Sequence, residues 1–314
     1  MLSHRRRFIS RASLMVAAAL LSVNATTQVK AANLFWDQNN STVGAGGTGT
    51  WDTSSAFWKN AGTATTISGN DATSASAFTS ADTAYFTGVA GTVTLGAPLT
   101  IGGLVFSDIT NTAAGNYVIA GSGVNILTLG APTTSASPTI KVTTGNIATI
   151  SAQVSGANGF AKTGQGSLWL TNNSNNFTGD IFVRDGSLIV SNNGQLGSGT
   201  TPIMVQGFYS NGLPFSGGAL VLNGATTGFT LSRQVNIVGR GPGVVSGSAA
   251  LISIGYNTIS AGLSLGSLNS ESRAWSSFGT TTISGPLTLN SSVGTAGTTG
   301  QVMALQGNGN WIIS

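Results

Sequence analysis

Cysteine is absent from this 314-residue chain, and its one histidine is His4. Serine–histidine and cysteine–histidine catalysis, and the common zinc sites, therefore have no side chains to use in the rest of the chain. Charged residues make up only 6% of the sequence, whereas disordered chains are usually rich in charge and poor in β-branched residues. Beyond the first residues we find no long pattern at helical periodicity. With 45 glycines and abundant Ser, Thr and Asn, the chain is predicted to be all-β and to form one elongated repeat array.

Positive charge is concentrated at the amino terminus. The first 32 residues contain five bases and no acid, and the remainder holds seven bases and eight acids. A basic segment around Arg5, Arg6 and Arg7, an apolar core over residues 12–21 and small residues before a cleavage site near Ala31/Ala32 predict a signal peptide over residues 1–32. Arg5-Arg6 fits both a twin-arginine signal and an ordinary secretory signal.

An exported mature chain with no transmembrane helix follows from this pattern, because no later apolar run reaches the length of a membrane span. Basic residues confined to a leader are not a nucleic-acid footprint, so we expect no nucleic-acid partner.

Residues 33–90 are predicted to form an N-terminal capping region that is rich in aromatic residues. Trp36-Asp37 is echoed fifteen residues later by Trp51-Asp52, and Trp58 follows. This spacing is too short for a propeller blade, which needs roughly forty residues. Two interpretations remain: the rings cover the open end of the first coil, or exposed Trp faces stack on carbohydrate.

One short pattern, a glycine followed by alternating apolar residues, recurs through residues 91–314. It is found at Gly91, Gly102, Gly166, Gly186, Gly218, Gly285 and Gly309. Alternate side chains of a strand point to the same face, and a strand-and-corner unit that recurs about every twenty residues indicates a solenoid. The unequal spacing predicts irregular coils, in which Asn and Thr side chains bond their counterparts one coil away. The sequence stops within a predicted strand, so we expect a further part after Ser314.

The best copy of the pattern, residues 159–199, resembles the autotransporter-associated β-strand repeat, also called the passenger-associated transport repeat. The repeat reads Lys-x-Gly-x-Gly-x-Leu-x-Leu, then Asn-x-aromatic-Thr-Gly, then Gly-x-Leu and Leu-Gly. The matching positions are Lys162, Gly164, Gly166, Leu168, Leu170, Asn175, Phe177, Thr178, Gly179, Gly186, Leu188, Leu196 and Gly197.

The resemblance implies a right-handed parallel β-helix in an exported passenger region of a Gram-negative-type bacterium. It implies a structural or adhesin-like protein at the cell surface, outer membrane or exterior, with the outer-membrane translocation machinery and an extracellular glycan or cell surface as partners. It implies no catalytic residue, cofactor or metal.

The alternative function is a polysaccharide-active β-helix enzyme, a lyase or hydrolase, which needs clustered carboxylates or a carboxylate-bound cation. The best candidates are Asp180, Arg184 and Asp185, although a spacing of five puts the two acids on opposite faces of a straight strand. The other acids are Asp37, Asp52, Asp71, Asp82, Asp108 and Glu271. Neither a calcium-binding Gly-Gly-x-Gly-x-Asp repeat nor a phosphate-binding loop is present, and the cationic loop around Arg240 is predicted to be a surface turn.

Overall fold

The structure, a computed structural model, describes residues 31–38, 46–63, 78–107, 116–131, 137–206, 217–239, 241–242, 248–266, 272–290 and 303–314. The chain divides into two units, Met1–Lys30 and Ala31–Ser314. The predicted signal peptide therefore lies outside the described residues except for Ala31 and Ala32, as do Asp71, Asp108, Arg240 and Glu271.

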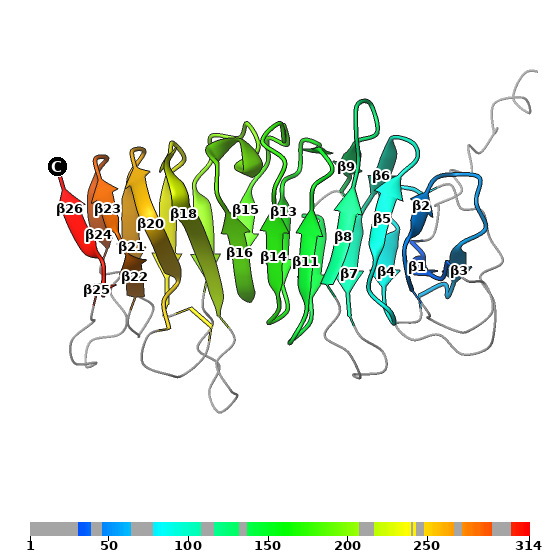
Figure 1. The fold of residues 1–314 in the computed structure, drawn as a ribbon, viewed down its shortest axis with the longest axis horizontal. Coiled ribbons are helices and arrows are strands. Elements are labelled where there is room, and N and C mark those ends of the chain that lie inside the picture. Colours follow the sequence, from blue (N-terminus) through cyan, green and yellow to red (C-terminus); the bar gives the residue numbers. More distant parts are fainter. Residues whose placement is uncertain are drawn as a thin grey trace, which may run out of the picture. The chain divides into compact units, whose positions relative to one another are not determined.

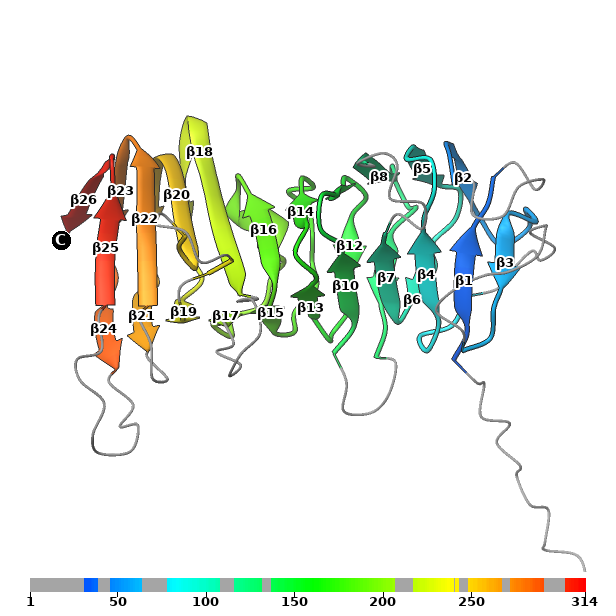
Figure 2. The ribbon, with the colours of Figure 1, turned by 90° about the horizontal axis from the view of Figure 1, so that it is seen from below.

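The unit Ala31–Ser314 consists of two large sheets and one small one (Figures 1 and 2). Apart from β3, which pairs outside β1, the strands of each sheet's continuous path follow one another in chain order. The first sheet contains, in spatial order, β24 (Leu287–Asn290), β21 (Leu263–Gly266), β19 (Val235–Val238), β17 (Ile203–Gln206), β15 (Ile181–Val183), β13 (Phe160–Thr163), β10 (Thr139–Val142), β7 (Gly103–Phe106), β4 (Thr83–Phe86), β1 (Asn33–Trp36) and β3 (Trp58–Asn60).

The second sheet has twelve strands, ten of them on one continuous path. The path runs through β2 (Gly49–Trp51), β5 (Thr92–Leu95), β8 (Asn116–Ala120), β11 (Ile147–Ile150), β14 (Ser167–Leu170), β16 (Gly186–Val190), β18 (Gly218–Leu231), β20 (Leu251–Ile259), β22 (Ser272–Phe278) and β25 (Met303–Gly307). Off this path, β23 (Thr280–Ile283) pairs with β20 and with β26 (Asn310–Ile313). The small sheet contains β12 (Val154–Ser155), β9 (Leu127–Leu129) and β6 (Leu99–Ile101).

Successive coils stack in parallel register, and the apolar alternation decides which side chains face inward. Leu168, Leu188, Leu220 and Leu251 stand at one register position on four adjacent strands, and each is 0% exposed. Burying one such side chain contributes about 1.5–3 kcal/mol. Among the described strands, every pair is parallel except β1 with β3. The predicted parallel β-helix is confirmed.

The coils are irregular because their turns differ in length. The turn from β16 to β17 spans residues 191–202 and contains the 3₁₀ helix η1 (Asn193–Leu196). The corresponding turns from β18 to β19 and from β20 to β21 span only residues 232–234 and 260–262. The long turn 191–202 is thus followed, in the next two coils, by turns of only three residues. We call the place where the long turn has no equally long neighbour the step.

The aromatic residues of the opening segment lie in the core. Trp36, Trp51 and Trp58 are at most 1% exposed, and the ring centroid of Trp58 lies 5.1 Å from those of both Trp36 and Trp51. The β3 strand pairs antiparallel with β1 at the edge of the first sheet. The aromatic rings therefore pack beneath the terminal strands of the two large sheets. The alternative that these Trp faces stack on carbohydrate is wrong, because they are buried.

Candidate functional site

The structure does not gather Asp180, Arg184 and Asp185 around one point. Asp180 precedes the short strand β15, whereas Arg184 and Asp185 follow it, so the two acids lie at opposite ends of that strand. The guanidinium carbon of Arg184 lies 5.4 Å from the ring centroid of Phe182. A pair of cooperating carboxylates would have to face one substrate bond. The proposed acid pair therefore has no shared site.

Lys162, the first residue of the repeat motif, is fully buried. Its ammonium nitrogen donates to the backbone oxygens of Thr163 at 3.0 Å, Gly164 at 2.7 Å and Asp185 at 2.8 Å. The first two acceptors belong to its own coil and the third to the next coil. Burial lowers the pKa of Lys162 to about 7, while the charge of Asp185 acts in the opposite direction. Because three acceptors require three N–H donors, the bonding pattern is that of the ammonium form.

Asn175 connects three successive coils through its side-chain amide. Its oxygen accepts from the backbone nitrogen of Val154 at 2.8 Å, and its nitrogen donates to the backbone oxygen of Gln195 at 2.8 Å. Both hydrogen bonds are buried. Asn175 thus satisfies backbone groups of the coil before and of the coil after its own.

The remaining motif residues also serve packing and turns. Gly197 has φ +73°, and a Cβ there would lie 2.3 Å from the Phe177 oxygen. Inward side chains are Leu168, Leu170, Phe177, Leu188 and Leu196, and Thr178 is exposed. Corner positions are Gly164, Gly166, Gly179 and Gly186, where a Cβ would approach backbone atoms within 2.3 Å. None of these positions presents a reactive group.

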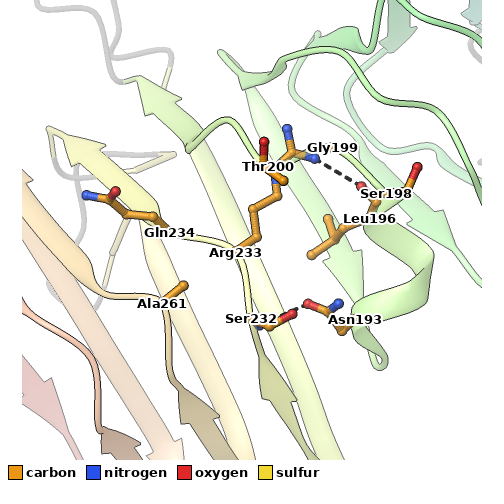
Figure 3. A pocket seen from close by; sticks show the side chains of 10 residues that line it. Asn193, Leu196, Ser198, Gly199, Thr200, Ser232, Arg233, Gln234 and Ala261 are labelled. Atoms are coloured by element: carbon orange, nitrogen blue, oxygen red, sulfur yellow. Dashed lines mark hydrogen bonds between the residues drawn. The ribbon is translucent and has the colours of Figure 1, made fainter.

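Arg233 is a buried cation that the sequence analysis missed, because a single Arg after a strand carries no motif. It lies at the step left by the long turn 191–202 (Figure 3). Its guanidinium donates to the backbone oxygens of Thr201, of Leu196 at 3.1 Å and of Gly179 at 3.0 Å. Burial lowers its pKa, and the charge of Asp180 opposes this. The Arg233 side chain thus donates hydrogen bonds to backbone oxygens of the preceding coils that the short turn 232–234 does not reach with its own backbone.

A hollow of about 380 Å³ lies against this step. Its lining consists of Asn193, Leu196, Gly197, Ser198, Gly199, Thr200, Ser232, Arg233, Gln234 and Ala261. A second hollow of about 220 Å³ is lined by Gly121, Ser122, Gly123, Asn125, Gln153, Asn172 and Ser174. Apart from Arg233, whose donors engage the backbone, neither lining holds a titratable side chain. These hollows offer hydrogen bonds to a ligand but no group for proton transfer.

The other described carboxylates support local structure. Burial opposes ionisation of Asp52, but hydrogen bonds from the backbone and hydroxyls of Ser55 and Ser54 lower its pKa overall. Asp82 accepts from the backbone nitrogens of Ala32 and Thr79, and Asp37 is buried. Within the described part of the chain, no group of three His, Cys, Asp or Glu residues could hold a metal ion. Over the same residues, no helix is long and apolar enough to cross a membrane.

Comparison with known proteins gives one informative match. Over 220 residues, 67% of this chain, the sequence is 37% identical to the protein named Adhesin BmaC autotransporter from Brucella suis biovar 1 (strain 1330). The aligned part spans only 6% of that adhesin, so the match covers a small fraction of its length. No protein-family model and no solved structure matches the chain. The match confirms that the chain is related to autotransporter-associated proteins.

Proposed function

We propose that this chain is part of an exported, adhesin-like passenger that acts by binding and not by catalysis. The observation that carries the proposal is its 37% identity, over two thirds of its length, to part of an autotransporter adhesin. The parallel β-helix with its polar hollows is consistent with that role. In this proposal, residues 1–32 are removed on export, residues 33–90 cap the helix, residues 91–314 form its repeats, and the outer-membrane translocation machinery is a partner.

Export and surface location are tested together in a Gram-negative host. Mass spectrometry of the recovered chain is expected to show that it begins near Asn33. Protease added to intact cells that express the protein in its natural context is expected to degrade it. A chain that keeps its first 32 residues and resists the protease would contradict the proposal. Replacing Arg5 and Arg6 by Lys separates a twin-arginine leader, which fails, from an ordinary secretory leader, which does not.

The enzymatic alternative is tested by incubating the purified chain with acidic and neutral polysaccharides. We expect neither new reducing ends nor unsaturated products, because Asp180 and Asp185 lie at opposite ends of β15. Cleavage that is lost in Asp180→Asn or Asp185→Asn would establish the enzyme instead.

We further propose that a neutral glycan of a cell surface contacts the hollow beside Arg233. The hydroxyl and amide groups of Ser198, Thr200 and Gln234 line it, and such groups bond sugar hydroxyls without requiring charge. On a glycan array, Gln234→Ala and Thr200→Val are expected to weaken binding, while Ser174→Ala in the smaller hollow leaves it unchanged. Equal binding by all three variants would contradict this site.

A further inference from the structure

The outward side of the second sheet carries a continuous row of mostly large apolar side chains. The row occupies one register position on seven neighbouring strands, β8, β11, β14, β16, β18, β20 and β22, at the front of Figure 1. We call it the outer row. In spatial order it consists of Val118, Thr149, Trp169, Ile189, Val221, Ile252 and Trp275.

The row points away from the core. Its chain neighbours Leu168, Leu188, Leu220, Leu251 and Ala274 are 0% exposed, and side chains alternate along a strand. Trp169 is 37% exposed and Val221 is 7% exposed, so the Trp169 ring stands above the Val221 side chain. The other five members of the row are half-buried. No charged residue belongs to the row. On β14 and β16 the neighbouring outward positions are Ser167 and Ser187, and Thr171 and Ser191 follow directly after these strands; all four are small and uncharged. Beside the row on β22 lies one outward cation, Arg273, two residues before Trp275.

When the row is turned end over end about Ile189 and laid on a second copy of itself, large side chains meet small ones at most positions. Reversal places Trp169 opposite Val221, and Thr149 opposite Ile252. At the ends it places Val118 opposite Trp275, while Ile189 meets its own copy. Away from the axis, each larger side chain therefore faces a smaller one, which favours close packing of the two faces.

We propose that the outer row is an interface between two copies of this chain. The copies pack face to face with their helix axes antiparallel, and the twofold axis passes along β16 at Ile189. Such an isologous interface uses the same surface on both partners. Because the row itself is uncharged, packing it against its own copy brings no like charges together.

The size of the interface sets its strength. Six strand spacings of about 4.8 Å give a length of about 29 Å, and three outward rows give a width of about 14 Å. The two copies together then bury about 800 Å², which is less than the roughly 1,200–2,000 Å² of stable protein–protein interfaces and belongs to the weak, transient class. We therefore expect a dimer that dissociates on dilution. The dimer does not depend on the proposed adhesin role.

Cysteine crosslinking tests the axis, because the chain contains no natural cysteine. Ile189→Cys places two thiols opposite each other across the axis, so a short bifunctional thiol-reactive crosslinker is expected to yield covalent dimers. Thr149→Cys and Ile252→Cys alone separate equivalent thiols by about four strand spacings, or about 19 Å, and are expected not to crosslink. Mixing these two variants brings unlike thiols together and restores crosslinking. Crosslinking of Val221→Cys but not Ile189→Cys would overturn the assignment.

Sedimentation over a range of concentrations tests the association itself. The 314-residue chain is expected to pass from monomer to dimer as its concentration rises, and Ile189→Arg is expected to weaken the dimer at least tenfold. Thr100→Arg, at an exposed position of the small sheet, is the matched control and leaves the dimer intact. Far-UV circular dichroism verifies that both variants are folded. A wild-type chain that stays monomeric, or a dimer indifferent to Ile189→Arg, would overturn the proposal.

Discussion

Asn175 offers a quantitative test of how the coils are held together. Replacing it by Ala leaves the buried Val154 nitrogen without its acceptor and the buried Gln195 oxygen without its donor. Each buried polar group that loses its partner costs about 1–3 kcal/mol. Asn175→Ala is therefore expected to lower the free energy of unfolding by about 2–5 kcal/mol. Urea unfolding, monitored by circular dichroism, measures this difference.

The Asn175→Asp variant distinguishes the contributions of the two hydrogen bonds, because its carboxyl group can donate only when protonated. Its carboxylate can still accept from Val154, but when ionised it faces the Gln195 oxygen without a donor. Burial and this contact raise its pKa in the folded state, so the folded state holds a proton that the unfolded state has lost. Stability relative to the wild type should therefore be greatest at about pH 4 and fall as the pH rises through the folded-state pKa. A loss below about 0.5 kcal/mol in Asn175→Ala, or a pH-independent Asn175→Asp, would refute the reasoning.

Two further predictions concern the buried cations. Burial lowers the pKa of Lys162 to about 7, so between pH 7 and pH 10 the unfolded state binds more protons there than the folded state. The free energy of unfolding of the wild type, minus that of Lys162→Met, should rise by about 3–4 kcal/mol over this range; a flat difference would contradict the assignment. Arg233→Ala leaves the backbone oxygens of Gly179, Leu196 and Thr201 without donors, and should cost about 3–5 kcal/mol and speed proteolysis within residues 191–202. Arg233→Lys, which keeps the charge but not the fork of donors, should recover only part of this loss.

The strands could be predicted from the sequence because the alternation of apolar and polar residues is a local pattern. Leu168 and Leu188 alternate with outward residues after a glycine corner, and that pattern alone fixes the inward face of each strand. The length of each turn also follows from the spacing between corners, but its consequences do not. Arg233 bonds the backbone oxygens of a long turn that lies beside a short turn of the next coil. No short sequence motif predicts that two such turns are neighbours. The carbohydrate-stacking alternative for Trp36 and Trp51 failed similarly, because burial depends on which strands pack over the rings.

The predicted hydrogen bonds from Asn and Thr to side chains one coil away form at some positions and not at others. In the described coils, Asn172 donates to the backbone oxygen of Ser151 and Thr171 to that of Ile150, in each case twenty-one residues earlier. These two side chains therefore bond the backbone of the neighbouring coil. Elsewhere side chains of different coils do bond each other: the hydroxyls of Thr128 and Ser155 lie 2.9 Å apart, and Gln195 donates to Asn173 at 2.9 Å. Uneven turns leave backbone groups without partners where one coil departs from the path of the next, and a short neutral side chain can reach them. Because most such bonds involve no ionised group, the stacking of the coils should depend little on salt, with Lys162 and Arg233 as the exceptions that titration and substitution can isolate.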